Sequence, residues 1–387
     1  MSKLRRLGTT VAVSSKKRLG LIVNPIAGMG GSVALKGTDG KEILDRAIEL
    51  GAVPVAPKRA VEALGRLVHL KKDIEILTYP YDMGEYEVRE CTMDPIVMGS
   101  ITKGETTSRD TRKAASDLLK SRADLILFAG GDGTARDVFE VVDQQLPVVG
   151  IPAGVKIHSG VFAINPRAAG ELAGMYLQQR TTATREAEVM DVDEQAFREN
   201  RLSAKLYGYL RIPCEETLVQ NPKATIGPGE EAALDGIACE IIENMDDDCV
   251  YVFGPGTTTR AILERLGLKK TLLGVDVVRK RQVVGSDVNE RQLLKLIERG
   301  KTKIVVTIIG GQGFIFGRGT QQISPEIIRL VGRQNILVVA TLGKLASLGQ
   351  RPLLVDTGDE EVDRMMAGYV QVTTGHGTSA VYKTESD

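Results

Sequence analysis

Tryptophan is absent from this sequence, and aromatic residues make up only 4% of its 387 positions. Because proteins that bind single-stranded nucleic acid stack the bases on aromatic side chains, this scarcity argues against such a function. An excess of charge is missing as well, since 50 Lys and Arg residues balance 50 Asp and Glu residues. A chain without a net field attracts neither nucleic acid nor an anionic membrane over its whole surface. We therefore expect no nucleic-acid partner, and any anionic ligand needs a local site.

Cysteine and histidine are few and scattered. The cysteines form no C-x-x-C pair, and they are Cys91, Cys214, Cys239 and Cys249. Neither they nor the three histidines have the spacing of a zinc site, and such a pattern is typical of reduced thiols in a cytosolic protein. Long hydrophobic runs are also lacking, including in the basic N-terminal stretch 1–20. We expect a soluble, cytoplasmic protein without a membrane span.

What is present is an alternation of short apolar runs and amphipathic helical patterns. The apolar runs lie at 19–25, 73–80, 124–130 and 147–154, and the helical patterns at 40–51, 57–70, 107–120 and 135–144. Strands that are apolar throughout and alternate with helices are typical of a parallel sheet covered on both faces. We predict a doubly wound α/β nucleotide-binding domain over residues 1–168.

The remaining residues, 169–387, predict a second domain. Between about 185 and 253 the sequence alternates or is rich in β-branched residues, which indicates a β-rich, antiparallel insert. Strand and helix patterns alternate again from Cys249 onward. These later α/β units either form a second lobe or extend the first sheet, and the sequence leaves both arrangements open.

Three glycines and an aspartate separate a buried strand from a helix in the run Gly130-Gly131-Asp132-Gly133-Thr134. Ligands of open α/β sheets bind at the carboxyl ends of the strands, where glycines and a helix N-terminus favour a phosphate. The charge of Asp132 would itself repel a phosphate. Its presence therefore predicts a base that takes a proton from an attacking hydroxyl, or a group that helps to place Mg²⁺. An ordinary N-cap or turn aspartate is the alternative.

Similar glycine turns follow later strands, at 254–257, 311–313, 317–320 and 375–378. Their simplest explanation is turn geometry, because glycine adopts a positive φ without steric cost.

Four segments together resemble a known superfamily. They are GGDGT at 130–134, IVNPIAG at 22–28, TTSRDTRKAA at 106–115 and GIPAGVKIHSGVFA at 150–163. This superfamily contains NAD kinases, diacylglycerol and sphingosine kinases and, more distantly, 6-phosphofructokinases. The segments look most like its ATP-NAD kinase-like group, which includes a protein encoded beside acetoin-catabolism genes. In the second half, GPGTTTRAI at 254–262 is similar to the Gly-Ser/Thr-Thr-Ala segment of NAD kinases.

The resemblance implies roles for individual residues. Asp132 would be the catalytic general base toward the acceptor hydroxyl. The nucleotide phosphates would be held by Asn24, Gly28, Thr106, Thr107, Gly130, Gly131, Gly133, Thr134 and Gly154. The acceptor side would include Thr257 and Thr258. We add Lys156, which could neutralise a transferring phosphoryl group, and His158, which could orient the acceptor hydroxyl. The alternatives are a solvated cation for Lys156 and a hydrogen-bonded loop histidine for His158.

The function that follows is a small-molecule kinase. It would transfer the γ-phosphoryl of ATP, or of another phosphoryl donor, to a hydroxyl, with NAD, giving NADP, as the first-choice acceptor. Mg²⁺ would bridge the phosphates and offset their charge. Because the parent families often assemble as dimers or tetramers, a homo-oligomer is expected.

Two departures from NAD kinases leave the acceptor open. Those enzymes carry an Asn-Glu pair between the glycine motif and the Gly-Thr segment, whereas Asn289-Glu290 comes later here and is interpreted as a helix cap. Asp137 stands where lipid kinases place a glutamate. The alternatives are a lipid or polyol kinase of the diacylglycerol kinase type, a non-catalytic NAD- or ATP-binding regulatory protein, and a sugar-phosphate isomerase-like second lobe built on GPGTTTRAI.

Overall fold

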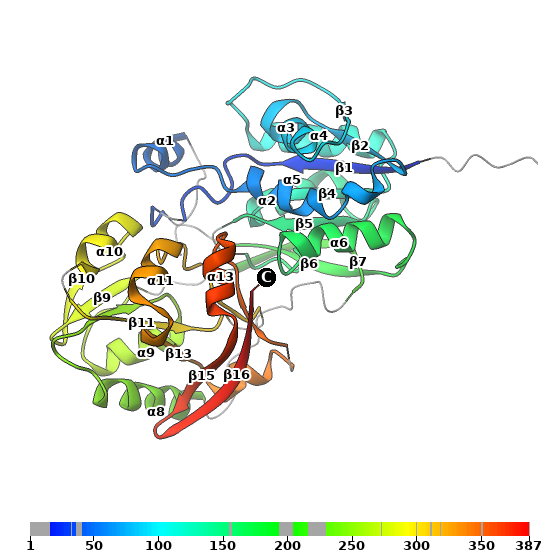
Figure 1. Ribbon diagram of the computed structural model, residues 1–387. Coiled ribbons are helices and arrows are strands. Elements are labelled where there is room, and N and C mark those ends of the chain that lie inside the picture. The colour runs from blue at the N-terminus through cyan, green and yellow to red at the C-terminus, as the bar shows by residue number, and fades with distance from the viewer. Residues whose placement is uncertain are drawn as a thin grey trace, which may run out of the picture.

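The computed structural model shows two lobes, each built on its own β-sheet (Figure 1). The structure describes residues 16–31, 33–35, 41–154, 157–192, 204–215, 230–271, 273–298, 300–309, 312–317, 319–349 and 351–386. No helix in these ranges combines the length and the apolar character needed to cross a membrane.

The first lobe is a five-stranded parallel sheet in the order β3-β2-β1-β4-β5. Its strands are β1 (Lys17–Val23), β2 (Ile74–Thr78), β3 (Pro95–Val97), β4 (Leu125–Gly130) and β5 (Val148–Pro152). Its helices are α1 (Lys41–Glu49), α2 (Ala56–Gly65), α3 (Glu85–Glu90), α4 (Ser108–Lys120), α5 (Asp132–Val142) and α6 (Pro166–Leu177), with short 3₁₀ turns at Val68–Leu70 and Tyr81–Met83. Every residue of β4 and β5 is buried, which explains their uninterrupted apolar character. The predicted doubly wound parallel sheet is confirmed.

Two helix layers cover this sheet. Helix α2 packs on α6 and contacts β4 and β5, while α4 packs on α5 and contacts β1 and β2. The strand order reverses between β1 and β4, because the chain moves outward from β1 to β3 and then returns to β4 on the other side. Such a reversal creates a crevice outside the carboxyl ends of the two strands, where α/β proteins bind their ligands.

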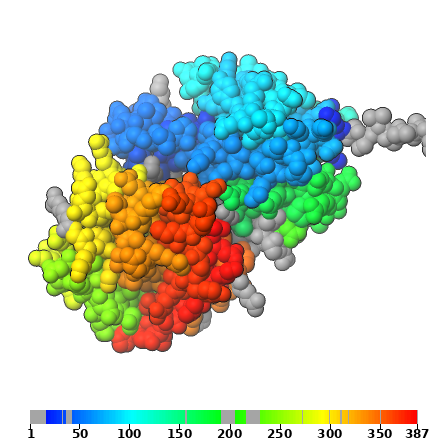
Figure 2. All heavy atoms as spheres, viewed as in Figure 1, coloured from blue at the N-terminus to red at the C-terminus, as the bar shows by residue number. Residues whose placement is uncertain are grey.

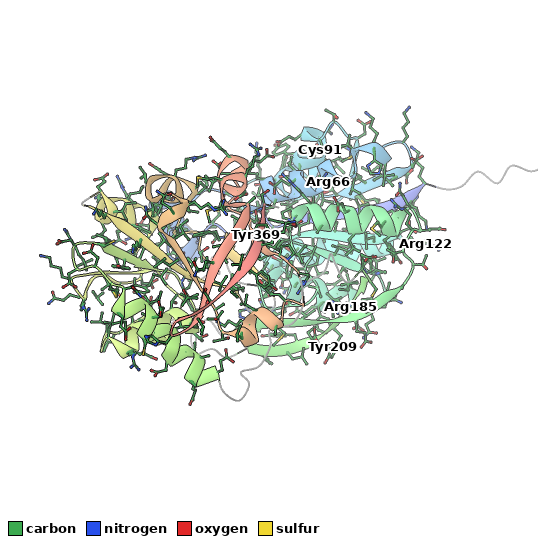
Figure 3. All side chains as sticks on the ribbon, turned by 60° about the horizontal axis from the view of Figure 1, so that its bottom comes forward. Arg66, Cys91, Arg122, Arg185, Tyr209 and Tyr369 are labelled. Atoms are coloured by element: carbon green, nitrogen blue, oxygen red, sulfur yellow. The ribbon has the colours of Figure 1, made fainter. Side chains whose placement is uncertain are left out.

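An antiparallel hairpin extends the first lobe. It is formed by β6 (Thr184–Val192) and β7 (Ala204–Pro213), which confirms the antiparallel insert predicted from the sequence. The hairpin packs on α5 and β5, and its inward side chains Ala187, Val189 and Leu210 belong to the core of the first lobe. Tyr209 lies on the outer side of the hairpin, as Figure 3 shows. The hairpin thus follows residue 168 in sequence but packs with the first lobe, and the predicted boundary at 168 stays a prediction.

The second lobe is a nine-stranded mixed sheet in the order β10-β9-β8-β11-β13-β15-β16-β14-β12. Its strands are β8 (Val250–Phe253), β9 (Asp276–Arg279), β10 (Gln282–Gly285), β11 (Thr302–Thr307), β12 (Phe314–Phe316), β13 (Ile336–Val339), β14 (Leu353–Val355), β15 (Gly368–Gly375) and β16 (Thr378–Ser386). Its helices are α8 (Glu230–Glu243), α9 (Thr257–Arg265), α10 (Glu290–Ile297), α11 (Pro325–Val331), α12 (Leu342–Ala346) and α13 (Glu360–Met366), with a 3₁₀ turn at Arg333–Asn335. The α/β units after Cys249 therefore form a separate sheet instead of extending the first.

Both faces of this second sheet are buried along β8. Along β8, Val250 and Val252 join one hydrophobic core, while Tyr251 and Phe253 join another on the opposite face. This alternation follows from the two-residue period of a strand, and it explains why the run is apolar throughout.

Helix α8 lies within the stretch where the sequence predicts β structure. Its buried residues Ile237, Ala238 and Ile241 have helical spacing and pack toward α9 and β15. Gly236 obscures this pattern, because a glycine inside a helix is usually unfavourable. Its reason is tertiary: a Cβ at Gly236 would lie only 2.9 Å from the backbone nitrogen of His376, in the turn between β15 and β16.

The two lobes lie against each other (Figure 2), and charged side chains make several of the contacts between them. Arg59 of α2 forms a 2.6 Å ion pair with Asp356, and Lys58 donates a 2.9 Å hydrogen bond to the carbonyl of Gly358. Arg167 of α6 pairs with Glu360 of α13 at 3.2 Å. A polar cavity of about 120 Å³ lies among these residues, which is smaller than the several hundred Å³ of a typical small-molecule pocket.

Candidate active site

The carboxyl ends of β1 and β4 lie side by side at the point where the strand order reverses. Val23 is paired with Ala129, and the backbone N–H of Asn24 donates to the carbonyl of Ala129 at 3.0 Å. The side-chain amide of Asn24 then donates to Oγ1 of Thr134 at 2.9 Å. Two sequence segments more than a hundred residues apart are therefore joined at one edge of the sheet.

Helix α5 begins inside the glycine motif. The sequence predicts a helix from Ala135, but the structure starts it at Asp132, with Gly131 as the N-cap in an extended conformation. This earlier start is favourable because a carboxylate in the first turn interacts well with the helix dipole. Gly131 offers no side chain to the first turn, whose N–H groups have no partner within the helix. The start of α5 can therefore offer backbone N–H groups to an anion.

Close packing explains Gly130 and Gly131 of the motif. None of Gly130, Gly131 and Gly133 has a positive φ. A Cβ at Gly130 would overlap the side chain of Thr134, and a Cβ at Gly154 would lie 2.8 Å from the Cα of Gly131. The turn after β4 and the turn after β5 can thus approach each other this closely only because the residues in contact are glycines.

Gly133 and Gly28 have different surroundings. No atom of the described residues lies within 4 Å of a Cβ built at Gly133, so this position faces open space. Gly28 has a φ of 81°, and a Cβ there would overlap the carbonyl oxygen of Ala153. The glycine-rich loop after β1 therefore packs directly against the segment that follows β5. Among the later turns, positive φ values at Gly256, Gly313 and Gly377 agree with the turn-geometry interpretation.

Asp132 is buried, with 6% of its surface exposed, and holds the segment after β5. Its Oδ2 accepts from the backbone N–H of His158 at 2.7 Å, and its Oδ1 accepts from that of Ser159 at 3.0 Å. A carboxylate oxygen has two lone pairs, so Oδ1 retains the capacity to accept a further proton or hydrogen bond.

His158 lies directly against this carboxylate. Its Nδ1 is 3.2 Å from Oδ2 of Asp132, and its side chain is only 5% exposed. This contact agrees with the alternative interpretation of His158 as a hydrogen-bonded loop histidine, and its role toward the acceptor hydroxyl stays a prediction. Lys156, the other residue that we placed here, lies outside the described residues.

The segment before α4 has a capping role. Thr107 is the N-cap of α4, and both its backbone N–H and its hydroxyl donate to Oδ2 of Asp110 at 2.8 Å. Thr106 precedes it and is half-buried. Arg112, one turn further along, forms a 2.7 Å ion pair with Asp137 of α5, which locks the two helices together.

The threonines expected on the acceptor side lie on the other sheet. Thr257 and Thr258 begin α9 at the carboxyl end of β8, after Gly256, which has a φ of 132°. Nζ of Lys344 in α12 donates to the buried hydroxyl of Thr258 at 2.8 Å. Sequence reasoning missed Lys344, because 86 residues separate it from Thr258 and no local motif marks it.

A loop of the second lobe reaches the edge of the first sheet. Nε2 of Gln312 donates to the carbonyl of Ile157 at 3.1 Å, immediately before the His158 N–H that binds Asp132. The side chain of Gln321 lies against Gly31, where it leaves no room for a Cβ. Both glutamines belong to glycine-containing segments that sequence reasoning interpreted only as turns.

The carboxylates suit a metal that arrives with a nucleotide. Within the described residues, no three His, Cys, Asp or Glu side chains are grouped so that they could hold an ion together. Mg²⁺ is commonly bound through one or two carboxylates, with phosphates and water completing its octahedron. Asp132 beside the uncapped start of α5 fits that arrangement, with the phosphates as the main ligands.

The two halves of the chain match the two domains of one enzyme family. Residues 19–181 match the ATP-NAD kinase N-terminal domain, and residues 246–384 match the ATP-NAD kinase C-terminal domain. The chain belongs to the ATP-NAD kinase family. In this family member the GGDGT turn, Asn24 and His158 lie within the first matched domain, and Thr257 and Thr258 lie within the second.

Solved structures and curated proteins add little to this assignment. The ATP-NAD kinase family member is similar to a putative diacylglycerol kinase from Bacillus anthracis str. Sterne, at 17% identity over 46% of each chain, with a TM-score of 0.24. It also resembles the UDP-GlcNAc 2-epimerase of Neisseria meningitidis, at 10% identity over 90% of this chain and 78% of that chain, with the same TM-score. The chain thus spans less than half of the diacylglycerol kinase, and neither likeness bears on substrate choice. No curated protein matches.

Proposed function

We propose that this member of the ATP-NAD kinase family transfers a phosphoryl group from ATP, or from another phosphoryl donor, to a hydroxyl group. One observation carries the proposal: a buried carboxylate, Asp132, lies beside the uncapped start of α5, where the carboxyl ends of β1 and β4 meet. The N–H groups of that first turn suit a phosphate, and the adjacent carboxylate suits the acceptor hydroxyl.

The carboxylate of Asp132 and the start of α5 then have separate roles in the reaction. The acceptor oxygen forms a bond to the γ-phosphorus, the bond from that phosphorus to the bridging oxygen of the donor breaks, and ADP leaves. Asp132 takes the proton of the acceptor hydroxyl. The N–H groups of His158 and Ser159 hold both carboxylate oxygens in place, so that little reorganisation is needed. Mg²⁺, when bound with the phosphates, would offset their negative charge.

NAD is the first-choice acceptor, and its phosphorylation gives NADP. The family membership of both domains supports this choice. We place the acceptor-binding residues Thr257 and Thr258 at the edge of the second sheet, where Lys344 adds a positive charge to the pair. A lipid or polyol hydroxyl is the second class of acceptor, and a homo-oligomer in the cytoplasm stays a prediction.

A non-catalytic nucleotide-binding protein is the rival function. The observation in its favour is that both oxygens of Asp132 already accept a backbone N–H, as a purely structural aspartate would. Under this hypothesis the same cleft binds NAD or ATP and regulates a partner.

Incubation of the protein with ATP, Mg²⁺ and NAD distinguishes the kinase function from the rival function. We expect NADP to form with turnover, measured by an enzymatic assay for NADP, with diacylglycerol and glycerol as alternative acceptors and polyphosphate as an alternative donor. Thermal stabilisation by ATP or NAD, without phosphoryl transfer in any of these mixtures, would establish the rival function instead.

Substitution of Gly133 by Ala tests whether the open space beside α5 receives the nucleotide. The helix itself gains about 0.5–1 kcal/mol of stability, because alanine suits a helix better than glycine. The new methyl group enters the space that we assign to the phosphates, so KM for ATP should rise roughly tenfold, a loss of about 1.4 kcal/mol of binding.

Gly65→Ala is the matched control for this variant. Gly65 ends α2, and a Cβ there also meets no described atom within 4 Å. We expect the control to leave KM unchanged. Equal KM values for Gly133→Ala and the wild type would place the nucleotide elsewhere.

A further inference from the structure

One peptide unit connects the second lobe to the carboxylate of Asp132. The peptide bond between Ile157 and His158 accepts a 3.1 Å hydrogen bond at its carbonyl from Nε2 of Gln312. The N–H of the same peptide donates at 2.7 Å to Oδ2 of Asp132. All three groups are removed from solvent, since Gln312 is 6% exposed, Ile157 4% and Asp132 6%.

The turn that carries Gln312 determines where its side chain points. The backbone N–H groups of Gln312 and Gly313 both donate to the carbonyl of Ile309, at 3.1 and 3.0 Å. Ile309 in turn donates to Phe314 at 2.9 Å, and Gly313 has a φ of 86°. The orientation of the amide is unambiguous, because a backbone carbonyl can only accept, and so the side-chain NH₂ must face it.

A second contact shows that this part of the second lobe follows the same edge. Gln321 lies against Gly31 in the loop after β1, while Gln312 contacts the segment after β5. Both contacts fall on loops at the carboxyl ends of the first sheet. The segment between β11 and α11 therefore rests on the edge where Asp132 lies.

A donor on one side of a peptide strengthens the hydrogen bond on the other, because hydrogen bonds in series polarise one another at low dielectric. Loss of the Gln312 amide would leave the buried carbonyl of Ile157 without this donor. It would also weaken the hydrogen bond from the N–H of His158 to Asp132. A carboxylate that is free to rotate presents its proton-accepting oxygen less often in the reactive position.

We propose that Gln312 is a positioning residue for Asp132, through which the second lobe orients the carboxylate of the first. Its kinetic consequence rests on the proposed kinase function, whereas its structural consequence does not. Gln312 itself touches neither the phosphates nor the acceptor in this proposal.

Selective labelling isolates the peptide in question. The sequence has three histidines, and His158 alone follows an isoleucine, since His69 follows Val68 and His376 follows Gly375. Protein labelled with ¹³C-carbonyl isoleucine and ¹⁵N-histidine therefore gives a single filtered amide signal, from Ile157-His158. Its chemical shift and its hydrogen-exchange rate report the two hydrogen bonds directly.

Gln312→Met is the main variant, because it keeps the volume of the side chain and removes the donor. We expect the Ile157-His158 signal to move upfield by more than its line width and its exchange to accelerate roughly tenfold or more. Gln312→Leu, which likewise has no donor, should move the signal in the same direction and provides a second variant. Gln371→Ala removes an exposed glutamine of β15 and should leave the signal unchanged.

The kinetic readout separates positioning from binding. In Gln312→Met we expect kcat to fall about 10- to 100-fold while KM for ATP and for NAD stays within roughly twofold. A variant that was only structurally damaged would lose binding and turnover together.

The possible outcomes are distinguishable. A wild-type signal position and wild-type exchange in both Gln312 variants would overturn the proposal, whatever the activity. If the wild-type protein transfers no phosphoryl group, the kinase function fails, and the labelled amide still decides whether Gln312 orients Asp132.

Discussion

Replacement of Asp132 by Asn is expected to lower kcat for NADP formation about 10²- to 10⁴-fold, the range for loss of a general base. Asparagine has nearly the same shape but cannot take the proton of the acceptor hydroxyl. Its amide also carries an NH₂ group where the aspartate has a second acceptor oxygen. One of the two backbone N–H groups, of His158 or Ser159, then faces a donor, which should cost about 1–3 kcal/mol of stability.

Loss of stability and loss of catalysis must be separated in this variant. Turnover is therefore measured well below the melting temperature of both proteins, and nucleotide binding is measured by calorimetry. In the absence of Mg²⁺, we expect ATP to bind Asp132→Asn at least as tightly as the wild type, because a negative charge near the phosphates has been removed.

Asp359→Asn is the matched control. Asp359 is the N-cap of α13 and accepts from two backbone N–H groups, those of Glu361 and Val362, both at 3.1 Å. Both N–H groups donate to Oδ1, which asparagine retains, so this variant removes a carboxylate charge and weakens the 2.6 Å ion pair of Oδ2 with Arg329 in the second lobe. We expect stability close to that of the wild type, because asparagine and aspartate cap helices equally well, and an unchanged kcat. Wild-type turnover in Asp132→Asn would show that this carboxylate is not the base.

Replacement of Lys270 by Met should have the largest effect on stability, a loss of about 3–5 kcal/mol, the range for breaking a buried ion pair. Nζ of Lys270 lies 2.8 Å from Oδ2 of Asp276, and both side chains are completely buried. The ammonium also donates to the carbonyls of Thr271 and Gly274, both at 2.8 Å, so its three protons are all used. The methionine variant would leave the carboxylate of Asp276 buried without its counter-ion.

The pH dependence of this effect has a definite sign. Burial opposes ionisation of Asp276, but the Lys270 ammonium and the surrounding donors outweigh it and hold the pKa of this carboxyl below its usual value of 3.8. A carboxyl whose pKa is depressed by folding adds stability above 3.8, and this contribution is lost as the pH falls below 3.8 toward the folded-state pKa. Without Lys270 the pKa should rise, so the variant should lose less stability on acidification than the wild type.

Urea unfolding at neutral and acidic pH measures both effects. The double variant Lys270→Met with Asp276→Asn should be more stable than Lys270→Met alone, because it buries no charge. Lys383→Met breaks an exposed pair with Glu385 and should leave stability almost unchanged. An equal cost for Lys270→Met and Lys383→Met would show that the buried pair contributes nothing to stability.

Much of the first lobe could be predicted from consecutive residues. The fully buried strands β4 and β5 follow from unbroken apolar runs. Either Thr107 or Ser108 could cap the following helix, and the structure has Thr107 as the cap, together with Asp110. Asn289 is likewise a helix cap, as predicted, with its side chain accepting from the N–H of Gln292 at 2.9 Å. Short elements fared worse: β3 and α3 were not predicted, because three and six residues show too little periodicity.

The candidate site likewise combines features that the local sequence predicts with contacts that arise only from packing. The GGDGT run predicts a ligand-binding turn. Asn24 and Thr134 lie close together because β1 and β4 pair in parallel. Which of the glycines are required for packing, however, depends on which atoms lie close to them in the folded protein. Gly131 meets Gly154 and Gly28 meets Ala153 only once the sheet has formed.

By itself, the sequence determined the period and burial of the strands, the helix caps and the glycine-rich turn with its carboxylate, because each is encoded within a few neighbouring residues. Only the tertiary structure decided that Gln312 meets Ile157 across 155 positions and that Lys344 meets Thr258 across 86. Such contacts depend on how separate sheets and helices pack. When a polar side chain meets its partner only through such packing, neither the residues around it nor the periodicity of the sequence indicates which residue the partner is.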